Sequence, residues 1–61
     1  MYVVEATLQN GLSLFFTPAG EWSTYVENAQ TFTTHDEAYD ALREALVWTP
    51  DRYLLSVAWI D

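Results

Sequence analysis

The sequence predicts a single α+β domain in which a small antiparallel sheet packs on one α-helix. Three observations predict it. Residues 34–48 show helical periodicity between a clear start and a clear stop, residues 2–16 alternate around an Asn-Gly turn, and residues 52–60 are rich in β-prone side chains. A chain of 61 residues has room for one domain, residues 1–61, and no linker or internal repeat divides it.

The predicted helix, about residues 34–48, begins at a capping box. Thr34 is followed three residues later by Glu37, so hydroxyl and carboxylate can accept hydrogen bonds from amides that the first turn leaves unpaired. Pro50 ends the helix because it cannot continue the hydrogen-bond ladder and pushes Thr49 toward extended backbone. At about 100° per residue one stripe faces the sheet, and because it is mostly alanine the sheet can approach the helix axis closely. The stripe consists of Ala38, Ala41, Leu42, Ala45 and Leu46.

The N-terminal hairpin, residues 2–16, has two conceivable registers. A two-residue Asn10-Gly11 turn would divide the apolar side chains between the two faces of the sheet. A three-residue loop that ends in a left-handed Gly11 gathers them on one face, and a slip of one residue would undo this arrangement. We therefore predict the three-residue loop. It pairs Leu8 with Leu12, Ala6 with Leu14 and Val4 with Phe16.

Residues 21–32 have no clear periodicity, because their apolar side chains are spaced for a helical turn about as well as for a strand. We expect an irregular crossing in which Trp22 and Ala29 are buried. A short additional strand near residues 29–33 is an option, since this stretch leads into the helix.

The last predicted strand, Arg52 to Ile60, is apolar on both faces, which is typical of a strand covered on both sides. The helix covers one side, and no other predicted element remains for the opposite side. Val3 and Phe15 also fall on the outward face of the hairpin, and monomers rarely expose a large contiguous apolar patch. We therefore predict a homodimer; the alternative is a monomer in which residues 21–32 fold over this face. The candidate dimer face comprises Val3, Phe15 and Trp59.

Acidic residues dominate the charge of the chain. Nine Asp and Glu stand against Arg43, Arg52 and no lysine, which gives a formal net charge of −7. Such a chain repels phosphates, so we expect no direct binding to nucleic acid or to an anionic membrane surface. The charge favours a basic protein or a nucleic-acid-binding complex as the partner. We expect a cytoplasmic protein, since the sequence shows no signal peptide and no apolar run of membrane-spanning length.

Carboxylates gather on the predicted helix, nearly opposite its alanine stripe. Two interpretations remain open. The carboxylates form either a solvated outer face or a row of charges, about 5.4 Å apart, that imitates phosphates and occupies a basic groove. The candidate partner-binding residues are Asp36, Glu37, Asp40 and Glu44, together with Glu27 outside the helix.

Residues suited to catalysis or metal binding do not form a recognisable motif. His35 is the single imidazole, and its sequence neighbour Asp36 is not placed by helical geometry to bond with it. Cysteine is absent, which excludes a disulfide. A single histidine without cysteines cannot form a zinc site. A helix presents carboxylates along a line rather than around a point, which disfavours a calcium site. We therefore predict no enzymatic activity, no metal and no cofactor.

Three short motifs follow one another from Gly20 onward: Gly20-Glu21-Trp22-Ser23, Ala29-x-x-Phe32 and Thr34-x-x-Glu37-Ala38. With the opening hairpin and the last strand, the chain resembles many small uncharacterised proteins encoded by phages and mobile elements. This class includes short acidic inhibitors of host defence, such as anti-CRISPR proteins. The resemblance implies an inhibitor of a host nucleic-acid-binding or CRISPR-type complex in the host cytoplasm. The spacing of the carboxylates adds the expectation that this inhibitor acts as a DNA mimic. The alternative function is a small homodimeric structural or regulatory module that works through an aromatic sheet face.

Overall fold

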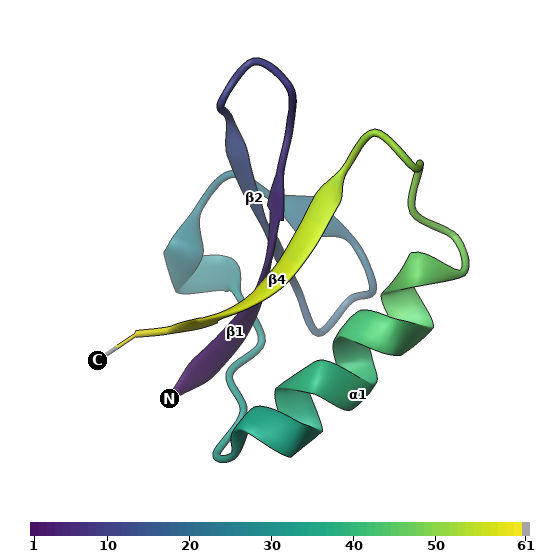
Figure 1. Ribbon diagram of the computed structural model, residues 1–61. Coiled ribbons are helices and arrows are strands. Elements are labelled where there is room, and N and C mark those ends of the chain that lie inside the picture. Colours follow the sequence, from purple (N-terminus) through teal and green to yellow (C-terminus); the bar gives the residue numbers. More distant parts are fainter. Residues whose placement is uncertain (61) are drawn as a thin grey trace.

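An antiparallel four-stranded sheet and one α-helix form the architecture in the computed structural model, which describes residues 1–60 (Figure 1). The strands lie in the order β3-β2-β1-β4. The predicted α+β class is confirmed. The elements are β1 (Tyr2–Thr7), β2 (Ser13–Phe16), β3 (Trp22–Ser23), the short 3-10 helix η1 (Val26–Asn28), α1 (His35–Leu46) and β4 (Leu54–Trp59).

The loop between β1 and β2 has the predicted three-residue form. The Leu8 N–H donates to the Leu12 carbonyl at 2.9 Å, and the Gly11 N–H donates to the Leu8 carbonyl at 2.9 Å. Gly11 has a φ of 88°, in the left-handed region that glycine tolerates best. The side chain of Asn10 accepts a further bond from the Leu12 N–H at 2.9 Å. The resulting register pairs Ala6 with Leu14, as predicted.

Helix α1 begins at the predicted capping box. The Thr34 hydroxyl accepts a bond from the Glu37 N–H at 3.2 Å, and the Glu37 carboxylate accepts one from the Thr34 N–H at 3.2 Å. The helix ends at Leu46, two residues before the predicted end at Trp48. In this last turn the N–H of Val47 donates to the Glu44 carbonyl at 3.2 Å, a bond between residues three apart, so the backbone tightens before Pro50.

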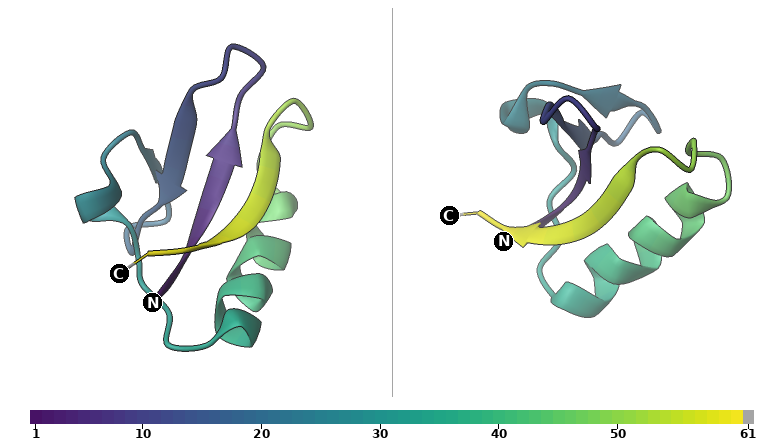
Figure 2. Two further views of the ribbon diagram at one scale, coloured as in Figure 1. Left: turned by 60° about the vertical axis from the view of Figure 1, so that its left-hand side comes forward. Right: turned by 45° about the horizontal axis from the view of Figure 1, so that its top comes forward.

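The alanine stripe of α1 faces β1 and β4, and the core forms between them (Figure 2). Ala38 and Val4 are completely buried, and Leu42 completes the central cluster. Leu46 differs from the prediction, since about half of it is exposed. It lies at the margin of the stripe, on the side of the helix away from the sheet centre. The side chains packed around the cluster are Tyr2, Phe16, Trp22, Phe32, Ala41, Leu55 and Val57.

Strand β4 occupies an edge of the sheet and pairs with β1 alone. Its apolar sequence predicted a strand covered on both faces, but the helix covers only one. Leu54, which points to the other face, is 73% exposed. The most deeply buried strand is instead β1, where Val3, Val4 and Ala6 are all inaccessible to solvent.

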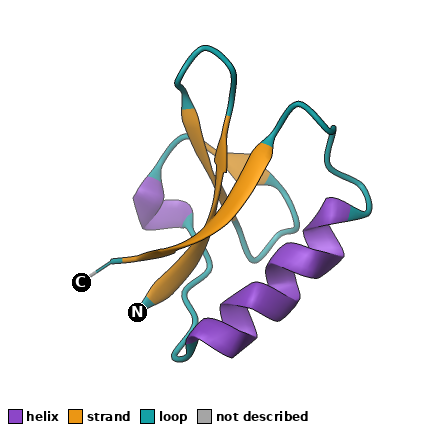
Figure 3. Cartoon of the chain, viewed as in Figure 1, coloured by secondary structure: helices purple, strands orange, loops and turns teal. Residues whose placement is uncertain are grey.

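Residues 21–32 form the irregular crossing that was predicted, but the strand within them lies elsewhere than expected (Figure 3). The fourth strand of the sheet is Trp22–Ser23, and the optional strand near residues 29–33 is reduced to one bridge between Phe32 and Tyr2. Trp22 and Ala29 are half-buried rather than buried. Helix η1 packs on β2 and lies on the opposite side of the sheet from α1 (Figures 1 and 2).

Replacement of Gly11 tests the hairpin loop. Gly11→Ala should lower the free energy of unfolding by about 1–2 kcal/mol, the cost of left-handed backbone for an L-residue. A Cβ at this position meets nothing within 4 Å, so the loss is conformational rather than steric. Gly11→Asn is the control and should lose clearly less, because asparagine tolerates this region. Urea unfolding measures both, and equal losses would contradict the loop conformation.

Candidate protein-binding surface

The outer face of α1 presents a row of carboxylates to solvent. Asp36, Asp40 and Glu44 follow one another at intervals of four residues, and all three are exposed. Side chains four apart in a helix lie on the same face, about 5–6 Å apart at Cβ. Because Ala38, Leu42 and Ala45 hold the opposite side of the helix against the sheet, this face cannot turn inward. We call Asp36, Asp40 and Glu44 the carboxylate row.

Glu37, a fourth candidate, has a structural function at the helix start. Its Oε1 atom accepts hydrogen bonds from both the N–H and the hydroxyl of Thr34, at 3.2 and 3.1 Å. A carboxylate held in this way contributes negative charge to the surface but is not free to turn toward a partner. The capping bonds also fix the first turn, so the carboxylate row stands on a helix with an ordered start.

The charge density of the row can be compared with that of a nucleic acid. From Asp36 to Glu44 the helix rises by about 12 Å. One DNA strand presents about four phosphates over that length, at about 3.4 Å each. The three carboxylates are about 6 Å apart along the axis, so the row carries a little more than half the charge density of one strand and less than a third of that of a duplex.

A shallow hollow opens beside the row. It is lined by Asp40, Arg43, Glu44 and Val47, which follow one another along the outer side of α1. Val47 is 87% exposed, the most exposed large apolar side chain of the described residues. The hollow thus combines two carboxylates with a guanidinium and an apolar contact point. Sequence periodicity identified the acids. It did not identify Val47 as an exposed contact point, because the predicted helix continued to Trp48 and Val47 was not expected to lie at the helix end.

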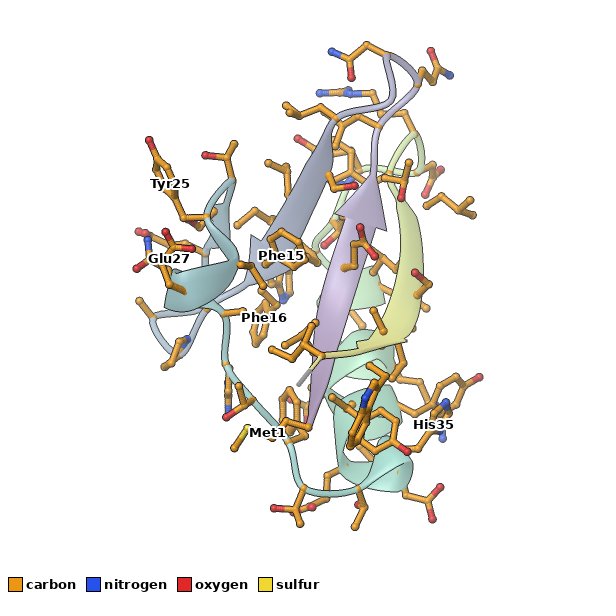
Figure 4. The ribbon with its side chains drawn as sticks, turned by 90° about the vertical axis from the view of Figure 1, so that its left-hand side faces the viewer. Met1, Phe15, Phe16, Tyr25, Glu27 and His35 are labelled. Carbon is orange, nitrogen blue, oxygen red and sulfur yellow. The ribbon has the colours of Figure 1, made fainter. Side chains whose placement is uncertain are left out.

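Glu27 does not join the carboxylate row. It lies on η1, whereas the row lies on α1, and the two helices are on opposite sides of the sheet (Figure 1). In Figure 4 Glu27 and Tyr25 point outward together, at the far side of β2 from α1. One flat partner surface could not contact Glu27 and the row together.

The candidate dimer residues Val3, Phe15 and Trp59 are not brought to one surface. Val3 is fully buried, and Phe15 is half-buried beside η1 (Figure 4). Trp59 is 63% exposed, but it pairs with Tyr2 and so belongs to the face of the sheet that α1 covers. The face opposite α1 therefore resembles the alternative arrangement over β2, where residues 21–32 fold across it. Along β4 the same face remains open.

His35, the single histidine, lies within a row of aromatic rings. Its imidazole stacks on Tyr39 with ring centres 6.2 Å apart and meets the edge of Tyr2 at 5.7 Å. Tyr2 in turn packs edge-on against Trp59 at 5.0 Å. These contacts connect the start of α1 to the end of β4. We call Trp59, Tyr2, His35 and Tyr39 the aromatic row.

A second group of aromatic rings closes the other end of the helix. Trp22 packs against Phe16, Trp48 and Tyr53, with ring centres 5.7, 6.1 and 6.5 Å away. Two buried polar atoms in this region have no hydrogen-bond partner among the described residues: Trp22 Nε1 and Thr49 Oγ1. Such atoms cost about 1–3 kcal/mol each when they remain unpaired, and a sequence cannot reveal them.

Within residues 1–60, no three histidine, cysteine or acidic side chains converge on a point where a metal ion could bind. The described part of the chain also has no helix long and apolar enough to cross a membrane. Comparison with protein families, with curated proteins and with solved structures gives no match.

Two threonines with equal burial test the unpaired hydroxyl. Thr17 and Thr49 are both 8% exposed, but only the Thr17 hydroxyl has a partner, the Glu21 N–H at 3.3 Å. Thr17→Val should therefore lower the free energy of unfolding by about 1 kcal/mol, whereas Thr49→Val should leave it unchanged or raise it by up to about 1 kcal/mol. Urea unfolding measures both. A loss in Thr49→Val as large as in Thr17→Val would show that a bound water pairs the Thr49 hydroxyl.

Proposed function

We propose that this protein is a non-enzymatic, acidic protein-binding module whose carboxylate row docks on a basic surface of its partner. The observation that carries the proposal is the exposed line of Asp36, Asp40 and Glu44 on a helix fixed by its cap and its buried alanine face. The helix backbone that carries the row is already ordered, so less of the electrostatic gain is lost to backbone entropy on binding.

The partner class that matches such a row is a protein with a basic groove for one nucleic-acid strand. The charge density of the row is nearer to that of a single strand than to that of a duplex, and the net charge of −7 adds long-range attraction to a basic surface. Together with the resemblance to small acidic phage proteins, this supports inhibition of a host nucleic-acid-binding or CRISPR-type complex, in the host cytoplasm. The same charge opposes direct contact with nucleic acid.

Val47 and Arg43 add an apolar contact and a positive charge to this acidic surface. Arginine is enriched among the residues that carry most of the binding energy in protein interfaces, and Val47 adds an exposed apolar contact beside Arg43. Arg43 lowers the negative charge of the hollow and can select a partner with a carboxylate at the matching position. The competing interpretation is a solvated outer face with no partner, and it predicts no effect of changes in this region.

Charge reversal in two places distinguishes these interpretations. Asp40→Lys/Glu44→Lys changes the row, and Glu21→Lys/Glu27→Lys makes the same change in net charge elsewhere, at two exposed positions away from α1. The first variant should slow association with the partner at least tenfold, because steering depends on local charge. The second should slow it only slightly.

The measurement is affinity capture from host lysate, followed by association kinetics with the captured protein. The complex should release its partner as salt rises from about 0.05 to about 0.5 M, and single-stranded nucleic acid should compete with it. Equal effects of the two variants would show that net charge alone matters. No effect of either variant, or capture that is indifferent to salt, would favour the solvated face.

A homodimeric module remains the second candidate function. The exposure of Leu54 and Trp59 on the edge strand favours it, although the working surface differs from the face predicted from the sequence.

A further inference from the structure

The outer edge of β4 lacks the features that normally prevent edge-to-edge pairing. Residues Leu54–Trp59 read Leu-Leu-Ser-Val-Ala-Trp, with no charge and no proline. Proteins usually protect exposed edge strands with lysine, proline, a bulge or a covering loop. In Figure 4 α1 lies behind β1 and β4, and no other described element lies beyond the outer edge of β4.

The hydrogen bonds to β1 identify the backbone groups that point outward. The Ile60 N–H donates to the Met1 carbonyl at 2.8 Å, and the Met1 amino group donates to the Ile60 carbonyl at 3.0 Å. Bonded and non-bonded pairs alternate along an antiparallel ladder. The next bonded residues of β4 are therefore Ala58 and Ser56, and the N–H and C=O groups of Leu55, Val57 and Trp59 point away from the sheet.

Apolar side chains flank this edge on both faces of the sheet. Leu54 lies exposed on the open face, and Trp59 lies exposed on the helix face. Tyr39 belongs to the aromatic row with Trp59, and Leu46 lies two turns further along the same side of α1; each is about half exposed. Trp48, in contrast, packs on Phe16 and Trp22 at the opposite side of the helix. We call Leu54, Trp59, Tyr39, Leu46 and the outer backbone of β4 the edge surface.

We propose that the edge surface binds a second copy of this chain, with the two β4 strands antiparallel and the two sheets joined into one of eight strands. A two-fold axis perpendicular to the sheet places Val57 opposite its counterpart and Leu55 opposite Trp59 of the second copy. This register uses all three outward-facing residues of β4 and forms six new backbone hydrogen bonds. Centring the axis on Ser56 would instead need Tyr53, whose N–H already donates to the Pro50 carbonyl at 3.0 Å.

The symmetry also brings the helices together. A two-fold axis perpendicular to the sheet keeps both copies of α1 on the same face, antiparallel to one another. The sides that carry Tyr39 and Leu46 then face each other above the joined strands. The carboxylate row points away from this contact, so a dimer of this form leaves the proposed partner-binding surface open.

The available area is sufficient for a weak but specific dimer. The exposed parts of the four side chains amount to about 500 Å² in each copy, and the strand backbone adds to this. Stable interfaces bury about 800 Å² in each partner, so we expect a dissociation constant in the micromolar range. The four side chains of the edge surface carry no charge, whereas each chain carries a net charge of −7. Added salt should therefore strengthen the dimer by screening repulsion, the reverse of its effect on a basic partner.

The first test is sedimentation velocity on the whole chain across micromolar concentrations. Leu54→Lys/Trp59→Lys should weaken dimerisation at least tenfold, because lysine on an edge strand opposes pairing. The matched control is Tyr25→Lys/Val26→Lys at and beside η1, where Tyr25 is 62% exposed. The control should leave dimerisation unchanged or strengthen it slightly, because two added lysines reduce the net charge of −7 that makes the chains repel one another. Asp40→Lys/Glu44→Lys should likewise not weaken it.

A backbone modification tests the register without changing a side chain. A chain of this length is accessible to chemical synthesis, and N-methylation of Val57 removes an outward N–H that β1 does not use. The modified chain should keep its thermal stability as a monomer and lose the dimer. In the unmodified protein an isotope-filtered experiment should connect the Hα atoms of Ser56 and Ala58 of different copies, which face each other in this register.

Three results would overturn the proposal. The first is that the unmodified chain stays monomeric at about 0.5 mM in added salt. The second is that the dimer survives N-methylation of Val57. The third is that the control variant weakens the dimer as much as the edge variant does. A monomeric result would indicate that the edge surface pairs with a strand of a different protein instead.

Discussion

The close approach of α1 to β1 is the constraint on which the remaining structure depends. Ala38 and Ala45 present no more than a methyl group to the sheet, so Val4 can lie directly beneath the helix. A chain of this size has few residues to spare for a core, and close contact between backbones compensates for small side chains. The large rings are then left for the two ends of the helix, where they close the core against water.

Local chemistry explains why much of the fold was predictable. The capping box needs Thr34 and Glu37 alone, and the hairpin register follows from the alternation of side chains around Gly11. Both depend on residues that are close in sequence, so no knowledge of tertiary structure is required. The same holds for the carboxylate row, because helical periodicity fixes which side chains share a face.

Features that depend on docking between distant segments could not be predicted. Whether β4 joins the sheet at its edge or its centre is decided by competition among strands, and an apolar sequence is compatible with both. Val3 is buried, and Glu27 on η1 is separated from the acids of α1, although nothing in the local sequence of either residue indicates this. Leu46 and Val47 show the same limit at the helix end, where exposure depends on how far the sheet extends beneath it.

The hydrogen bonds between Met1 and Ile60 make the chain almost a closed ring. The first and last described strands lie side by side, so Met1 and Ile60 meet at the same end of the sheet, away from the β1–β2 loop (Figure 1). A short linker could join them, and the chain could be reopened at the exposed loop of Gln9 and Asn10. The order in which the elements are connected along the chain can therefore change without a change in how they pack. A domain fused to either end would extend from the same end of the sheet.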